Sequence, residues 1–172
     1  DELWDYAEEK WVIDDSNVND LDYQQHIFAA YASYGYRFSK LTLKAGTRLE
    51  YTLNRGLSKS ASGNLTFDNS NFNIVPYLNA AWKIDSRNTL SASYTRRLGR
   101  PSVTYLNPYI FEESPYSKMH GNPDLRTVVS DALTLTYRTS GETWDLTART
   151  YGSLCNNKIE YLSEVYPDGG KV

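Results

Sequence analysis

The chain has 172 residues, a net charge of −3 at neutral pH, one cysteine and an aromatic content of 14%. This length gives room for one domain, and the acidic balance supplies no basic field that would attract nucleic acid. A mean hydropathy of −0.59 and the lack of any apolar run of about eighteen residues exclude a helical membrane bundle. One cysteine, Cys155, excludes an intramolecular disulfide framework.

Residues 1–22 are acidic and rich in Asn, and we expect a loop there. Within it, Asp15–Asp20 carries oxygen side chains at alternate positions, as the opening of a calcium loop does. The segment is not an EF-hand, which would need Gly in place of Asp20 and Glu in place of His26. A calcium site completed by other loops and a solvated acidic loop both stay open. We assign no metal ligand and expect no cofactor.

Apolar and polar residues alternate in six long segments downstream, the period expected of half-buried strands. These segments are 26–38, 41–53, 72–85, 87–98, 133–138 and 144–149. The pattern predicts an all-β fold, an antiparallel meander of about six long strands. After Asn156-Asn157 the alternation changes phase through Ile159 to Val165, which predicts a bulge.

The connections between these segments alternate in length. Those near 39–40, 85–88 and 140–142 are short, whereas 54–71, 99–127 and the tip at 167–170 are long. In a meander, alternate connections share an edge, so all short turns lie at one end. This asymmetry is typical of outer-membrane barrels. Both ends of the chain look cut, and we therefore interpret residues 1–172 as a partial barrel domain whose remaining strands lie elsewhere.

The charged side of the strands decides between two interpretations. In hydrocarbon each charge would cost several kcal/mol, so a membrane barrel must direct this side to a wet interior. A soluble secreted β-barrel or an adhesin-type ligand-binding protein would instead place the same side outside, and this alternative stays open. The residues concerned are Lys44, Arg48, Glu50, Lys83, Arg97, Arg138, Asp145 and Arg149.

Four motifs carry a resemblance to a known family. They are Tyr94-Thr-Arg-Arg97, Arg100-Pro-Ser102, Leu106-Asn-Pro-Tyr109 and Gly121-Asn-Pro-Asp-Leu125. In this order they resemble the C-terminal barrel half of TonB-dependent receptors, of the outer-membrane β-barrel type common in Bacteroidetes. The likeness covers about residues 24–165. Thr127-Val128 depart from the Pro-Glu pair that the family usually has at that place.

The resemblance implies a location and a function. It implies a bacterial outer-membrane protein with long loops outside the cell, which imports a nutrient or metal chelate through a plugged barrel and carries out no covalent chemistry. The implied partners are outer-membrane lipid, the TonB energy-coupling system, a nutrient ligand and, where one exists, a surface lipoprotein. A passive porin, or the barrel anchor of a surface enzyme, is a further alternative.

Candidate ligand contacts come from the charged side and from the loops. We select Arg48, Glu50, Arg97 and Arg149 in the strands, and Tyr105 and Tyr109 in the loop. Loop aromatics either stack on a planar ligand or pack the loops together; this group also includes Trp4, Trp11 and Tyr116.

Two further sets of residues have competing interpretations. The arginines Arg96, Arg97 and Arg100 either meet an anionic substrate or pair with interior carboxylates. The Pro residues of the motifs fix the path of the long loop, and Gly121 permits a positive φ there. His26 and His120 have no triad-like neighbours, so we expect no catalytic site.

Overall fold

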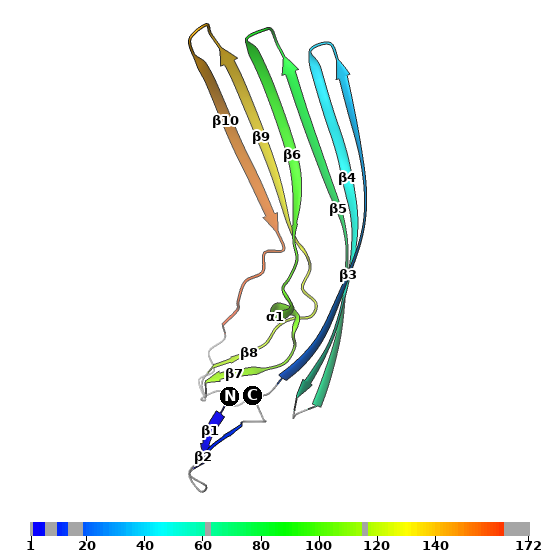
Figure 1. Ribbon diagram of the computed structural model, residues 1–172, viewed down its shortest axis with the longest axis vertical. Coiled ribbons are helices and arrows are strands. Elements are labelled where there is room, and N and C mark those ends of the chain that lie inside the picture. The colour runs from blue at the N-terminus through cyan, green and yellow to red at the C-terminus, as the bar shows by residue number, and fades with distance from the viewer. Residues whose placement is uncertain (1, 6–9, 14–18, 61–62, 115–116, 164–172) are drawn as a thin grey trace.

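The structure, a computed structural model, describes residues 2–5, 10–13, 19–60, 63–114 and 117–163. Six strands form one antiparallel sheet in the order β10-β9-β6-β5-β4-β3 (Figure 1). Their bounds are β3 Asn19–Phe38, β4 Leu41–Ser60, β5 Gly63–Lys83, β6 Asn88–Gly99, β9 Val128–Ser140 and β10 Asp145–Asn156. Each strand pairs with its neighbour in sequence, apart from the short elements between β6 and β9, so the predicted all-β meander is confirmed.

The register assigns every side chain to one of two faces, because directly opposed residues in a sheet point the same way. Arg37 opposes Thr42, which in turn opposes Ala81, so these three lie on one side. Large apolar residues such as Phe28, Phe72 and Leu133 lie on the other side and are exposed in the isolated chain. We call these the charged face and the apolar face. All eight charged residues assigned from the alternation lie on the charged face, as predicted.

The two ends of the sheet differ. Three short connections, 39–40, 84–87 and 141–144, lie together at one end, which we call the turn end (Figure 1). The first is a two-residue turn in which Ser39 takes a φ of 48° without being Gly or Asn. At the opposite end, the loop end, residues 100–127 connect β6 to β9. The predicted clustering of short turns is therefore confirmed. In the described part of the chain, no helix is long and apolar enough to cross a bilayer.

The loop predicted over 54–71 is wrong, because the hairpin of β4 and β5 continues through most of it. The ladder runs from Asn54 opposite Asn69 to Ser60 opposite Gly63. Polar residues hid these strands, since Ser and Asn occupy both faces there. On one face Asn54 and Ser58 are buried, and their side chains form hydrogen bonds with residues of the neighbouring strands β3 and β5.

Two other expectations fail at the ends of the chain. Residues 1–22 contain two short paired strands, β1 Glu2–Asp5 and β2 Lys10–Ile13. They also contain the start of β3, which pairs with β4 from Asn19 onward. The strand β10 ends at Asn156, because Asn157 takes a φ of 56°, which is outside strand geometry. In the described residues the predicted bulge after Asn156 is therefore not found. Val165 lies outside the described residues.

The buried side chains gather at the loop end on the charged face. Leu106 is fully buried, and Tyr109 and Phe67 are nearly so. Phe67 lies over Gly56, where a Cβ would meet the Phe67 ring at 2.2 Å. The small core therefore lies between the sheet and residues 100–127, which positions that segment for any role it has.

Candidate functional site: a loop docked on the charged face

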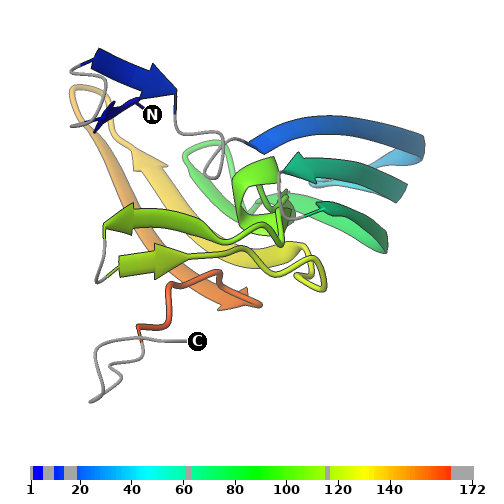
Figure 2. The same ribbon diagram turned by 90° about the horizontal axis from the view of Figure 1, so that it is seen from below.

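Residues 100–127, which we call the docked loop, fold back against the charged face. The loop contains the one-turn helix α1 Val103–Leu106 and the strand pair β7 Phe111–Ser114 and β8 Ser117–Met119. Seen from the loop end, α1 lies between β9 on one side and β3 to β5 on the other (Figure 2). The helix α1 is therefore placed inside the curve of the sheet.

Glu50 of β4 is the first anchor of the docked loop. Its side chain is only 2% exposed, and its carboxylate accepts hydrogen bonds from the guanidinium group of Arg100, with Arg100 Nε at 3.1 Å. Arg48, two residues away on the same face, places Nη2 at 3.2 Å from the other carboxylate oxygen. A buried carboxylate needs such partners, since an unpaired charge is costly to remove from water. The contact joins the start of the loop to the middle of β4.

Asn69 of β5 is the second anchor. Its side-chain amide donates to the backbone oxygens of Pro123 at 2.7 Å and Leu125 at 3.0 Å. The amide is itself oriented, because its oxygen accepts hydrogen bonds from Asn54 and Asn71. The far end of the loop is thus held by amide side chains that stand on neighbouring strands of the hairpin.

The two ends of the docked loop also hold each other. The Gly121 amide donates to the Asn107 oxygen at 2.8 Å, and the Asn122 amide donates to the Tyr105 oxygen at 2.7 Å. A Cβ on Gly121 would lie 2.5 Å from the Tyr105 oxygen, so only Gly permits this approach. The expected positive φ at Gly121 is wrong: among described glycines only Gly63 has one. Close backbone contact explains the residue instead.

Of the loop aromatics predicted as ligand contacts, Tyr109 packs within the docked loop and Tyr105 packs against a residue beyond β10. Tyr109 is 6% exposed and meets the edge of Phe111, with ring centroids 4.8 Å apart. Tyr105 is half-buried and contacts the ring of Tyr161 at 5.6 Å. The packing interpretation is therefore confirmed for Tyr109, whereas Tyr105 keeps an accessible edge. For Trp4, Trp11 and Tyr116, no side-chain position is described.

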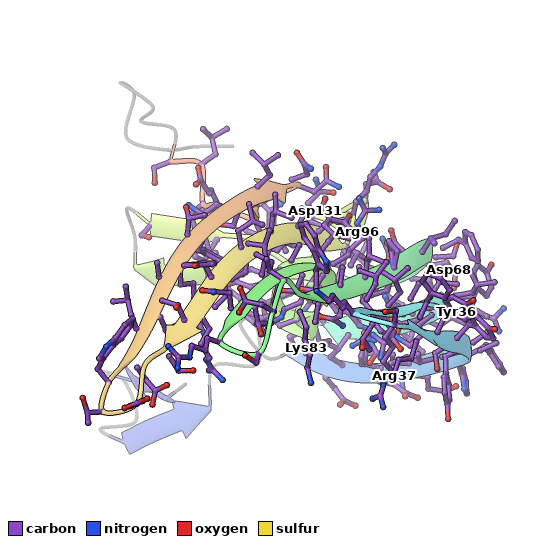
Figure 3. All side chains as sticks on the ribbon, turned by 90° about the horizontal axis from the view of Figure 1, so that it is seen from above. Tyr36, Arg37, Asp68, Lys83, Arg96 and Asp131 are labelled. Atoms are coloured by element: carbon purple, nitrogen blue, oxygen red, sulfur yellow. The ribbon has the colours of Figure 1, made fainter. Side chains whose placement is uncertain are left out.

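The expectation that Arg96 pairs with an interior carboxylate is wrong. Arg96 and its partner Asp131 both lie on the apolar face, where Arg96 Nε is 2.8 Å and Nη2 3.0 Å from the carboxylate oxygens. Figure 3 shows this pair on one side of the sheet and Arg37 and Lys83 on the other. The Tyr94 hydroxyl donates to the same carboxylate at 2.6 Å. The alternation of Leu90, Ala92 and Tyr94 had already indicated this face for Arg96.

The remaining predicted site residues are not brought together. Arg97 and Arg149 are exposed on the charged face, and no described residue makes a hydrogen bond or ion pair with either side chain. Only Arg48 and Glu50 of the selected residues meet. Sequence reasoning missed Asn69, although the spacing of Asn69, Asn71 and Asn73 was a usable signal, since all three point to the charged face.

No metal centre is found in the described part of the chain, where no three His, Cys, Asp or Glu side chains gather. The calcium hypothesis for Asp15–Asp20 mostly lies outside the described residues. Its last member, Asp20, lies at the loop end of β3, on the same side of the sheet as the apolar face, and opposes Lys59 of β4.

Comparison with known proteins adds one finding. The sequence model described as the outer membrane protein beta-barrel family matches residues 3–172. No curated protein sequence matches the chain. The family match covers the sheet, the docked loop and the terminal segments together. It explains why the sheet has an apolar face, which no described segment covers, opposite a charged face.

Proposed function

Because the chain belongs to the outer membrane protein beta-barrel family, we propose that it forms part of the wall of a TonB-dependent receptor. The apolar face then contacts outer-membrane lipid, and the charged face lines the interior of the barrel. In this role the wall carries no covalent chemistry. Its work is to hold a loop inside the interior, so that a nutrient or chelate passes only when the receptor is energised.

The observation that supports the proposal is the position of the motifs that resemble TonB-dependent receptors. Each motif after β6 supplies an anchor of the docked loop. Arg100 binds Glu50, Asn107 and Gly121 close the loop on itself, and the stretch from Pro123 to Leu125 binds Asn69. Three of the four motifs that resemble TonB-dependent receptors therefore fix a loop on the charged face, which is the interior face under this proposal.

The soluble alternative is disfavoured by the apolar face. Four large apolar side chains of this face are each more than half exposed: Phe28, Tyr34, Phe38 and Leu154. A secreted protein with this surface would expose a large contiguous apolar patch to water, which soluble monomers avoid.

Topology is tested first. In the full-length receptor with Cys155→Ser, a cysteine at Asn64 at the loop end should react with a bulky impermeant maleimide on whole cells. A cysteine at Ser86 at the turn end should react only after the outer membrane is broken. The reverse pattern would refute the orientation of the barrel.

Energy coupling is tested separately. The full-length receptor in detergent should retain the purified periplasmic domain of TonB on an affinity column, and a porin from the same membrane serves as the control. A receptor with the expected topology that fails to retain this domain would leave an outer-membrane barrel but refute TonB-dependent import.

A further inference from the structure

The apolar face carries a polar cluster that the proposed import function does not use. It consists of Tyr94 and Arg96 of β6 and Asp131 of β9, and we call it the lipid-side cluster. Arg96 donates through Nε at 2.8 Å and through Nη2 at 3.0 Å to the two carboxylate oxygens, and the Tyr94 hydroxyl donates to one of them at 2.6 Å. The neighbours of the cluster on the same face of these two strands are apolar: Ala92, Leu98, Val129 and Leu133.

Further strands of the barrel do not cover this cluster. The strand β6 lies between β5 and β9, and β9 lies between β6 and β10. A sheet closes into a barrel by pairing at its free edges, which here are β3 and β10, so additional strands extend the wall without covering its outer surface. Figure 3 shows Arg96 and Asp131 on the side of the sheet opposite Arg37 and Lys83. In a barrel whose charged face lines the interior, the cluster therefore faces lipid.

The cluster lies near the loop-end boundary of the membrane. Arg96 is eight residues along β6 from Asn88, which is about 26 Å at roughly 3.3 Å per residue. With a strand tilt of about 35–45° this is about 20 Å of height, whereas the apolar band of such barrels is about 25 Å tall. Tyr94 suits this level, because barrel tyrosines gather where hydrocarbon meets the headgroups. Under the proposed orientation, the lipids beside the cluster belong to the outer leaflet.

Arg96 keeps hydrogen-bond donors that the protein does not use. A guanidinium group has five N–H donors, and Asp131 accepts two of them. Even with the Tyr94 oxygen counted as a third acceptor, at least two N–H groups find no partner within the described part of the chain. The Arg96 side chain is 32% exposed, so these groups reach the surface. Hydrocarbon offers them no acceptor, whereas the phosphate and acyl-linkage oxygens of a lipid headgroup do.

We propose that the lipid-side cluster binds the headgroup of one outer-leaflet lipid, whose phosphate or acyl-linkage oxygens accept hydrogen bonds from Arg96. This inference goes beyond the proposed import function and rests only on the orientation of the barrel. Asp131 holds the guanidinium group in place and cancels its charge, so the site recognises the headgroup by hydrogen-bond geometry. Because the cluster has no net charge, binding should change little as salt is raised.

Native mass spectrometry of the full-length receptor tests the site. The receptor is freed of lipid in a neutral detergent and titrated with lipid A, the membrane anchor of lipopolysaccharide. Replacing both Arg96 and Asp131 by Leu removes the cluster without leaving an unpaired charge, a kind of change that proteins commonly tolerate. We expect the apparent Kd of the tightest-bound lipid A to rise about tenfold, because hydrogen bonds from a charged group are lost.

The matched control replaces Arg55 and Asp68 by Leu. This ion pair stands on the same side of the sheet, but its distance is 3.5 Å and both side chains are largely exposed, so lipid A affinity should stay unchanged. A second variant, Arg96→Lys, keeps the ion pair but loses the planar fork of donors, and it should weaken binding several-fold. This variant decides the question if the double Leu variant does not fold.

Three results would overturn the site: lipid A affinity that neither Arg96 variant changes, an equal loss in the control variant, or displacement of lipid A by inositol hexakisphosphate, which would indicate a general anion site. The assay needs neither TonB nor transport. Failure of TonB binding with lipid A binding intact would therefore refute only the import function. Loss of the lipid site with TonB binding intact would refute only the present inference.

Discussion

The turn end and the loop end of the sheet share one apolar face but have different interiors. At the loop end, Glu50 binds Arg100 of the docked loop, while the buried Asn54 and Ser58 form hydrogen bonds with side chains of β3 and β5. At the turn end, Lys44, Lys83 and Arg138 are exposed, and no described residue forms a hydrogen bond or ion pair with their side chains. The same alternating pattern thus occurs in a closed half, at the loop end, and in an open half, at the turn end. The docked loop, which contacts only the loop end, makes the difference.

The largest effect is expected from removing the buried carboxylate at the closed half. Glu50→Ala leaves Arg48 and Arg100 on one wall without a counter-charge, and both are partly exposed. We expect a loss of about 2–3 kcal/mol in the free energy of unfolding of the full-length receptor, measured with urea in detergent.

The matched control is Asp68→Ala. Asp68 pairs with Arg55 at 3.5 Å, but both side chains are largely exposed, so its removal should change stability by less than about 1 kcal/mol. Equal effects of the two variants would show that the docked loop does not depend on Glu50.

A smaller effect is expected at the other anchor of the loop. Asn69→Ala removes the donor to the half-buried backbone oxygens of Pro123 and Leu125, at a cost of about 1–1.5 kcal/mol in the free energy of unfolding. Hydrogen exchange at the Gly121 and Asn122 amides should become faster, since these amides lie in the loop closure. Asn64→Ala, on the opposite face of β5, serves as the control. Unchanged exchange in both variants would show that Asn69 does not hold the loop.

The smallest effect is expected at the open half, in the turn of residues 84–87. The side-chain amide of Asn88 and the backbone amide of Arg87 donate to Asp85 and lower the pKa of its carboxyl group. A lowered folded pKa means that this contribution is present above the ordinary Asp value of about 3.9 and is lost as pH falls through the folded value.

Amide chemical shifts of Arg87 and Asn88 should therefore titrate with a midpoint below that ordinary value, and Asp85→Asn should abolish the titration. A midpoint at or above the ordinary value would show that the turn does not hold the carboxylate. Neither result should alter exchange in the docked loop, which lies at the other end of the sheet.

Alternation predicted the faces of the strands because each strand needs only its own residues to show them. Lys44 and Arg149 were placed on the charged face in this way. The same rule would have placed Arg96 on the apolar face, had the arginines not been treated as one cluster.

The contacts of the docked loop could not be predicted in the same way. Arg100 and Glu50 are fifty residues apart, and nothing local in either segment specifies the other. For the same reason the polar hairpin of 54–71 resembled a loop: its buried Asn54 and Ser58 are polar, and their hydrogen-bond partners Tyr23 and Asn19 are more than thirty residues away in the sequence.

The hairpin of β4 and β5 has a consequence for the shape of the barrel mouth. β4 continues seven residues past Leu53, about 23 Å at roughly 3.3 Å per residue, whereas β6 and β9 stop near Gly99 and Val128. Outward-facing side chains of this extension, such as Arg55, Lys59 and Asp68, are charged, so it stands clear of lipid. The strand ladder at the loop end is therefore uneven, with β4 and β5 extending beyond the ends of β6 and β9 (Figure 1). On the side of β6 and β9 the docked loop continues the wall in place of further strand ladder.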